Sequence, residues 1–177
     1  SRNVVKKIHT SHGAFVVKHF RGMYFFNRLA YSLFRKSKAA RSYQYSNLLN
    51  EKGIATPPHV AWIDCYTMGL LTRSYFVSVF YPNKTLAEML QYYDIFDVSH
   101  KHSLLRHLAA FVLKLHQLGV YHEDLSPGNI LVIRTLDGYD FALVDLNRIK
   151  FRTVDFSAGL RNFITLSMAA EDLNMLI

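Results

Sequence analysis

A predicted β-hairpin between residues 130 and 145 limits the fold of this chain more than any other feature. Leu136-Asp137-Gly138 separates two apolar segments, Ile130–Arg134 and Tyr139–Asp145, and an Asp-Gly pair between apolar strands is a strong signal for a tight turn. If these segments pair, Asn129, just before the first strand, comes close to Asp145 at the end of the second. The sequence therefore predicts two oxygen-bearing side chains at one end of a hairpin.

Asn129 and Asp145 carry the kind of oxygen ligands that Mg²⁺ prefers, and Mg²⁺ usually keeps waters and phosphates as its other ligands. We predict that these two residues hold a magnesium ion. Asp124 precedes Asn129 by five residues in a loop marked by Pro127-Gly128. Its carboxylate can face a substrate hydroxyl and accept the proton, so Asp124 is the predicted catalytic base. A positioned base and a bound metal are what phosphoryl transfer requires.

The apolar pattern changes near Pro82, where we predict a boundary between an N-terminal lobe (1–81) and a C-terminal lobe (82–177) of an α+β fold. Residues 21–50 are expected to be helical, over Tyr24–Phe34 and Lys38–Asn50. The other elements predicted before the boundary are two hairpins. The first has strands over Asn3–His9 and Ala14–Phe20, and the second has strands over His59–Tyr66 and Leu70–Tyr81. After it, a buried-faced helix is indicated by the helical spacing of Leu104, Leu108, Phe111, Leu115 and Leu118.

The charge of the chain is uneven. The net charge is +8, and the first 50 residues hold ten basic residues and no acidic residue. Such asymmetry favours an anionic partner, which can be a nucleic acid, a membrane surface or a phosphorylated substrate. Basic and aromatic residues alternate over Arg21–Arg41, which is typical both of a segment at an anionic membrane interface and of a helix with its aromatic residues in the core.

The composition narrows the class of protein. Half of the residues are apolar, which argues against a disordered chain. No apolar run is long enough to cross a bilayer, and the first residues do not resemble a secretory signal. The single cysteine, Cys65, excludes an intrachain disulfide and a cysteine-based zinc site. We expect a cytoplasmic protein.

The histidines do not indicate a metal site. His116 and His122, on either side of Gly119, are spaced for neither one helix face nor a metal pair, and we interpret them as structural. His100, His102 and His107 are interpreted as solvated residues near a helix start.

The pattern His122-x-Asp124-x-x-x-x-Asn129, followed by Asp145, resembles the catalytic loop and metal-binding Asp of the protein-kinase-like superfamily. Its continuation, Leu125-Ser126-Pro127-Gly128, looks like the Asp-Leu-His-Pro-Gly-Asn loop of small-molecule and lipopolysaccharide kinases. Residues 35–43 and 53–58 are similar to the Ser-Lys-Ala-x-Arg-Ser-Tyr and Gly-Ile-x-Thr-Pro patterns of the lipopolysaccharide core (Kdo/heptose) kinase family.

This resemblance, over roughly residues 2–165, implies a bilobal kinase fold with an antiparallel-sheet N-lobe, a helical C-lobe and ATP between them. It also implies ATP- and Mg²⁺-dependent transfer of the γ-phosphoryl group to a sugar hydroxyl of the lipid A–core glycolipid at the cytoplasmic face of the inner membrane. Lys18, in the apolar strand 15–20, resembles the lysine that holds the ATP phosphates. Val79 and Tyr81 are further nucleotide-binding candidates.

The chain departs from the kinase pattern at several points. The glycine-rich loop before Lys18 is missing, and we expect a fold truncated at both ends. Gln44 stands where a Glu should pair with Lys18, and Glu51 is the alternative partner. No Ala-Pro-Glu follows Asp145.

Two other functions stay open at the level of sequence. One is a RIO-like serine kinase that phosphorylates a protein. The other is a pseudokinase that binds a nucleic acid or a protein through its basic lobe, which the intact Asp124, Asn129 and Asp145 oppose. We favour the glycolipid over a nucleic acid as the partner, with peripheral contact to an anionic membrane.

Overall fold

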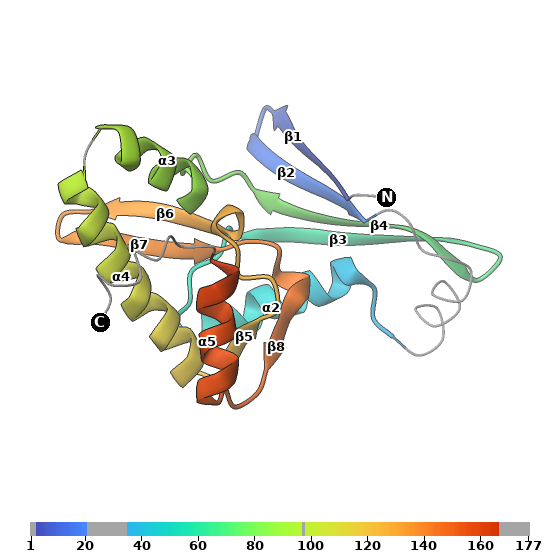
Figure 1. Ribbon diagram of the computed structural model, residues 1–177. Helices are drawn as coiled ribbons and strands as arrows, with labels where there is room; N and C mark the ends of the chain where they lie inside the picture. Colours follow the sequence, from blue (N-terminus) through green and yellow to red (C-terminus); the bar gives the residue numbers. More distant parts are fainter. Residues whose placement is uncertain (1–2, 21–34, 97, 167–177) are drawn as a thin grey trace. The chain divides into compact units, whose positions relative to one another are not determined.

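The structure of the protein is a computed structural model that describes residues 3–20, 35–96 and 98–166 (Figure 1). The chain divides into two compact units. Unit 1 comprises Ser1–Glu51 and Thr56–Tyr81, and unit 2 comprises Lys52–Ala55 and Pro82–Ile177. Each unit is described by itself. Both combine helices with antiparallel strands, in agreement with the predicted α+β class.

Unit 1 contains a four-stranded antiparallel sheet. In spatial order its strands are β1 (Val4–Thr10), β2 (Gly13–Phe20), β4 (Leu70–Val79) and β3 (His59–Thr67). Both predicted hairpins are therefore confirmed. The pairing of β2 with β4, which the sequence did not indicate, joins the hairpins into one sheet. Two-stranded hairpins are marginal by themselves in water, so this pairing stabilises both.

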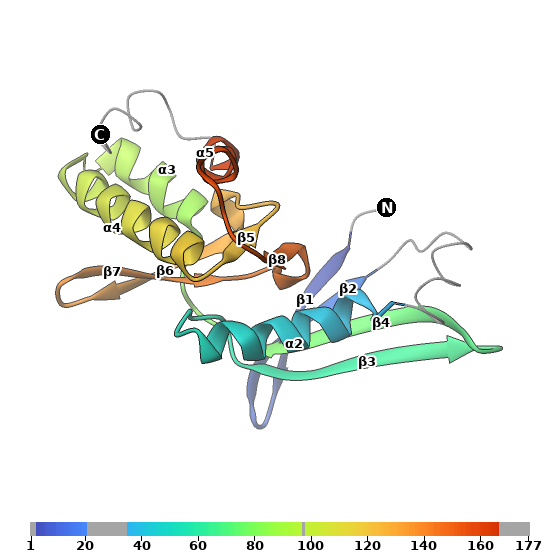
Figure 2. The same ribbon diagram turned by 90° about the horizontal axis from the view of Figure 1, so that it is seen from below.

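Helix α2 (Lys38–Glu51) packs on one face of this sheet, along β3 and β4 (Figure 2). Ser37 caps the helix, because its hydroxyl accepts the backbone N–H of Ala40 at 3.0 Å. Ser46 lies on the buried side of the helix, and its Oγ is 2.8 Å from Nδ1 of His59 on β3. The predicted helix over Lys38–Asn50 is confirmed, whereas the one over Tyr24–Phe34 lies outside the described residues.

Unit 2 is built around the predicted hairpin, β6 (Ile130–Thr135) and β7 (Gly138–Leu143), whose register pairs Thr135 with Gly138 and Ile130 with Leu143. Helices α3 (Leu86–Phe96) and α4 (Val98–Gln117) pack against it (Figure 1). The face of α4 toward the core is formed by the buried residues Leu104, Leu105, Leu108, Val112 and Leu115.

The edges of the β6–β7 hairpin are covered by neighbouring backbone. On the β7 side, the N–H of Leu143 donates to the carbonyl of Ala55 at 2.9 Å. On the β6 side, the N–H of Val132 donates to the carbonyl of Lys84 at 2.9 Å. These bonds tie each strand of the hairpin to neighbouring backbone, which opposes a shift of its register.

Helix α3 was not predicted, although its first turn carries a capping box. The hydroxyl of Thr85 accepts the N–H of Glu88, and the Glu88 carboxylate accepts the N–H of Thr85 at 2.7 Å. The pattern Thr-x-x-Glu before an apolar run was the signal available in the sequence.

The remaining elements in the described part of unit 2 are two short strands, two 3-10 turns and one helix. Strand β5 (Val120–His122) pairs with β8 (Ile149–Phe151), and α5 (Phe156–Thr165) lies beside β5 (Figure 1). Single 3-10 turns cover Pro127–Asn129 and Leu146–Arg148. Asp155 caps α5 by accepting the N–H of Ala158 at 2.8 Å. None of the helices within the described ranges is long and apolar enough to cross a membrane.

One sequence interpretation was wrong. His107 is half-buried in α4 rather than solvated: its Nδ1–H donates to the carbonyl of Ser103 at 2.7 Å, and its ring packs edge-on against Tyr139. The ring fills the space that Gly138 leaves by having no side chain. The Asp-Gly turn is therefore also a packing contact with α4.

We predict that Gly138→Ala destabilises the protein by about 2–4 kcal/mol. Gly138 has a φ of +144°, which disfavours alanine, and the new Cβ would collide with the His107 ring. Urea unfolding measures the loss. It should be smaller in a His107→Ala background, because the collision is then gone. Gly128→Ala is the control, since its Cβ meets nothing within 4 Å; an equal loss there would contradict the explanation.

Candidate active site

The loop that carries Asp124 is fixed by hydrogen bonds to its backbone. The N–H of Asp124 donates to Nδ1 of His122 at 3.1 Å, and the carbonyl of Asp124 accepts the side-chain N–H of Asn129 at 2.8 Å. The same carbonyl accepts the N–H of Ser126 at 2.8 Å. Leu125 is fully buried whereas Asp124 is exposed. The loop therefore presents the Asp124 side chain to solvent from a backbone that is held in place.

The hairpin brings the two predicted metal ligands to neighbouring backbone positions. Immediately beyond the Ile130–Leu143 pair, the N–H of Val144 donates to the carbonyl of Asn129 at 3.0 Å. The sequence prediction that Asn129 and Asp145 lie close together is confirmed for the backbone.

Asp145 adopts a left-handed conformation, with φ 56° and ψ 45°. A non-glycine residue rarely holds this conformation unless the surrounding structure imposes it, and such residues cluster at functional sites. The side-chain amide of Asn147 donates to Oδ1 of Asp145, which orients the carboxylate.

The buried ring of His122 links the two halves of this site. Its Nδ1 accepts the N–H of Asp124, so the proton of the neutral ring is on Nε2, which donates to the carbonyl of Val144 at 3.4 Å. Burial lowers the pKa of His122, while the Val144 carbonyl and the carboxylates of Asp145 and Asp124 act more weakly in the opposite direction. A neutral ring suits this geometry, because a proton on Nδ1 would face the N–H of Asp124. The structural role inferred for His122 is confirmed.

The chemistry of the donors fits a magnesium ion. The Asn129 amide nitrogen is bound to the Asp124 carbonyl, which leaves its oxygen as the end available to a metal. Asp145 supplies a half-exposed carboxylate. Within the described residues no three His, Cys, Asp or Glu side chains gather as a metal site. A Mg²⁺ ion held by Asn129 and Asp145 would therefore take phosphates and water as its other ligands.

The other predicted residues lie in unit 1. Lys18 on β2 pairs with Phe76, and strand alternation puts it on the sheet face that α2 covers, the face of His59. Val79 pairs with Phe15 and so faces the opposite side, and its backbone N–H donates to the carbonyl of Pro58. The structure therefore does not bring the side chains of Val79 and Lys18 to one face. Tyr81 is half-buried beyond the end of β4.

Gln44 and Glu51 lie on a common face of α2, because seven residues make two helical turns. This face is roughly opposite to the one that Ser46 and Leu49 bury. Gln44 is half-buried, and Glu51 is exposed at the end of the helix. The pairing of either residue with Lys18 stays a prediction.

The comparisons with known proteins decide the family. The model of the lipopolysaccharide kinase (Kdo/WaaP) family matches residues 3–175, nearly the entire chain. The chain belongs to this family. Kinases of this family use ATP, so a nucleotide is the expected cosubstrate. The family resemblance drawn from the Asp124 loop and from residues 35–43 and 53–58 is confirmed.

A solved structure described as WaaP in complex with acyl carrier protein is similar to this lipopolysaccharide kinase family member, with a TM-score of 0.69 and 18% sequence identity. The match covers 98% of this chain and 72% of that chain. At this identity the likeness concerns the fold. None of the curated protein sequences compared with the chain matches it.

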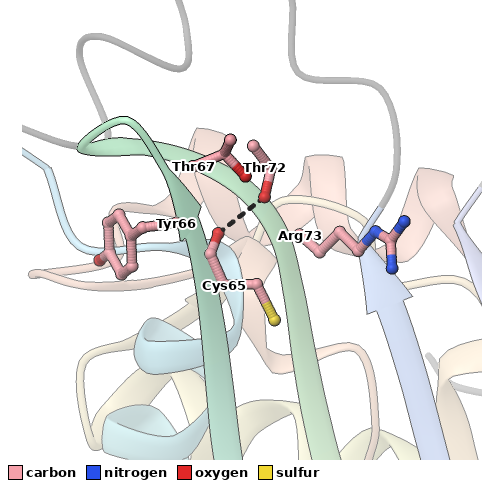
Figure 3. A pocket seen from close by; sticks show the side chains of 5 residues that line it. All are labelled: Cys65, Tyr66, Thr67, Thr72 and Arg73. Atoms are coloured by element: carbon pink, nitrogen blue, oxygen red, sulfur yellow. Dashed lines mark hydrogen bonds between the residues drawn. The ribbon is translucent and has the colours of Figure 1, made fainter.

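A hollow in unit 1 does not coincide with the predicted residues of this kinase-family chain. It lies at the end of the β3–β4 hairpin, beside Cys65, Tyr66, Thr67, Thr72 and Arg73 (Figure 3). The Thr72 hydroxyl donates to the Cys65 carbonyl at 3.0 Å, while Tyr66 and Arg73 point in opposite directions (Figure 3). These side chains do not converge on one point, so we assign no site here.

Sequence reasoning missed two residues of α5, Asn162 and Thr165. The Asn162 amide donates to the His122 carbonyl, and the Thr165 hydroxyl lies within hydrogen-bond distance of both the Leu125 and the Asn162 carbonyls. Asn162 is almost fully buried. A buried asparagine in a helix usually has a specific hydrogen-bonding role, but its burial cannot be read from the sequence.

We predict that Asp145→Ala weakens Mg²⁺-dependent nucleotide binding by about tenfold or more, since loss of even an outer-shell partner typically costs that much. Isothermal titration with ATP, with and without Mg²⁺, measures the effect. Asp140→Ala is the matched control, because Asp140 is an exposed carboxylate on β7 away from the loop. Full Mg²⁺ enhancement in Asp145→Ala would contradict the assignment.

The lowered pKa of His122 predicts a pH effect on stability. Between pH 6.5 and the lower folded pKa, the unfolded chain binds the proton more readily than the folded one. Stability should therefore be full above about pH 6.5 and fall as the pH drops, by at most about 1.4 kcal/mol per pH unit for this group.

Urea unfolding from pH 7.5 to 5.5 tests this effect, and the slope should be smaller in His122→Gln. His59→Gln is the comparison, because burial lowers the pKa of His59 as well. A slope unchanged by His122→Gln would show that His122 does not titrate in this range.

Proposed function

We propose that this chain transfers the γ-phosphoryl group of ATP to a sugar hydroxyl of the lipid A–core glycolipid. Membership of the lipopolysaccharide kinase family supports this substrate class. The observation that carries the proposal is the backbone bond from Val144 to Asn129, which joins the Asp124 loop to the left-handed Asp145. A base and two metal ligands then lie on adjacent, hydrogen-bonded segments, as phosphoryl transfer requires.

Asp124 acts on the acceptor in this proposal. The sugar hydroxyl attacks the γ-phosphorus, the bond from that phosphorus to the β–γ bridging oxygen breaks, and ADP leaves. The hydroxyl proton passes to the Asp124 carboxylate. Orientation is the larger part of this role, because the protein has little covalent chemistry to perform in phosphoryl transfer.

Asn129 and Asp145 would hold Mg²⁺, which supplies charge neutralisation on the phosphates when it is bound. Lys18 would contact the ATP phosphates as a point charge, with Gln44 or Glu51 as its partner on α2. Val79 and Tyr81 would serve the nucleotide from the end of β4. The N–H of Val79 already bonds to the Pro58 carbonyl.

The charge of unit 1 supports an anionic partner. The acidic side chains among its described residues are Glu51 and Asp64, and Asp64 accepts a hydrogen bond from Ser74. Its basic side chains are Lys6, Lys7, Lys18, Arg35, Lys36, Lys38, Arg41 and Arg73. We propose peripheral contact with the anionic surface of the inner membrane, where the glycolipid is presented. Most of the predicted contact segment, Arg21–Arg41, lies outside the described residues.

Since the similar solved structure is of WaaP in complex with acyl carrier protein, we include such a protein among the partners to test by co-purification.

Incubation with radiolabelled ATP, Mg²⁺ and either purified lipid A–core glycolipid or a generic protein acceptor tests the function. We expect label in the glycolipid, and none when Mg²⁺ is chelated. Label in the protein alone would support a RIO-like kinase. No turnover with either acceptor would support a pseudokinase.

We predict that Asp124→Asn lowers transfer to the glycolipid by about 10²–10⁴-fold, because the amide neither accepts the proton nor carries the charge that orients the hydroxyl. Nucleotide affinity should be nearly unchanged. Asp140→Asn, the same chemical change on exposed β7, is the control and should retain full activity. Equal activity of Asp124→Asn and wild type would remove Asp124 from the mechanism.

A further inference from the structure

Helix α5 holds the backbone on both sides of Asp124. The side-chain amide of Asn162 donates to the carbonyl of His122 at 2.8 Å. One turn later, the hydroxyl of Thr165 lies 3.1 Å from the carbonyl of Leu125 and 2.8 Å from the carbonyl of Asn162, so its single proton is shared between the loop and the helix. The two carbonyls flank Asp124 in sequence, and both donors come from one helix turn. Together these bonds fix the direction of the chain through Asp124.

The orientation of the Asn162 amide follows from its partners. A carbonyl only accepts, so the atom facing His122 O is the amide nitrogen. The amide oxygen then faces His116, whose Nε2 lies 3.1 Å away and must carry a proton to bond with it. Asn162 is 1% exposed, so a partner on each side of its amide is what its burial requires.

His116 in turn is held between α5 and the end of α4. Its ring packs edge-on against Phe163. A Cβ added at Gly159 would lie 3.3 Å from Nδ1 of His116, so the helix approaches the ring closely because residue 159 is glycine. The contacts run without interruption from α4, through His116 and Asn162, to the backbone of His122.

We infer that Asn162 and Thr165 are positioning residues for Asp124, and that His116 fixes the amide of Asn162. This inference rests on the proposed function, because it takes Asp124 to be the catalytic base. It assigns to α5, which carries none of the predicted site residues, the task of holding the reacting carboxylate in place.

The size of the effect follows from the need for accurate placement. A displacement of a reacting group by about 1 Å can cost about 10²-fold in rate. Loss of a hydrogen bond from Asn162 or Thr165 lets the loop move, while Asp124, Asn129 and Asp145 all remain present. The loss should therefore appear in kcat for phosphoryl transfer, while KM for ATP stays within about twofold.

Four variants test the inference with the radiolabel assay. Thr165→Val removes the hydroxyl at an exposed position with little change of shape, Thr165→Ser restores it, and Asn162→Ala removes the buried amide. Ser157→Ala is the control on the same helix, since Ser157 is exposed and bonds to Arg161 instead of the loop. We expect kcat to fall about tenfold in Thr165→Val and about 10²-fold in Asn162→Ala, with recovery in Thr165→Ser and no change in Ser157→Ala.

Combination with Asp124→Asn separates positioning from general destabilisation. If Asn162 and Thr165 act through Asp124, their substitution should lower the residual rate of Asp124→Asn by much less than it lowers the wild-type rate. Multiplicative losses would overturn the inference and show that the helix acts elsewhere.

Amide hydrogen exchange gives a readout that does not depend on activity. Thr165→Val and Asn162→Ala should speed exchange in the loop at 122–126 and leave the hairpin at 130–143 protected. Unchanged exchange in the loop would overturn the inference whatever the activity. If the wild type shows no transfer but the variants speed exchange in the loop, the proposed function fails, while the positioning of the loop by Asn162 and Thr165 is upheld.

Discussion

The pairing of β6 with β7 is the constraint on which the candidate active site depends. Its register ends at Ile130 opposite Leu143, and the next backbone bond, from Val144 to Asn129, sets Asp145 beside the Asp124 loop. A slip of one residue would turn every side chain of a strand to the other face and break this bond. The glycine turn and the covered edges of the hairpin oppose such a slip, so the packing of unit 2 is directly connected to the geometry of the site.

The described interactions that hold the Asp124 loop are mostly neutral. His122 is an uncharged ring bonded to the loop and to Val144, and Asn162 is an amide bonded to His116 and to the loop. Buried neutral groups with satisfied hydrogen bonds cost much less than buried charges. The carboxylates of Asp124 and Asp145 reach the exposed side of this scaffold, where a metal ion and phosphates can compensate their charge.

Family membership bears on the substrates of this protein, whereas the charge of unit 1 bears on its binding to an anionic surface. The family match supports ATP and a lipopolysaccharide substrate, whereas the basic character of unit 1 concerns how an anionic surface or partner is approached. Lys18 contributes to the basic charge of unit 1 and is also the predicted contact of the ATP phosphates. It lies on the sheet face that α2 covers. Gln44, the predicted partner of Lys18 on α2, is a neutral amide and carries no charge.

Local signals determined much of what the sequence predicted. The Asp137-Gly138 turn, the spacing from His122 to Asn129 and the apolar period of α4 act between neighbouring residues, so the hairpin, the loop and the helix follow from the chain alone. Contacts between distant segments could not be predicted in this way. The pairing of β2 with β4, the burial of His107 against Gly138 and the bonds from Asn162 and Thr165 to the loop join residues of different elements that are 31 to 64 positions apart. Only tertiary packing decides these contacts, because they depend on the distance between elements, and the packing of the core sets that distance.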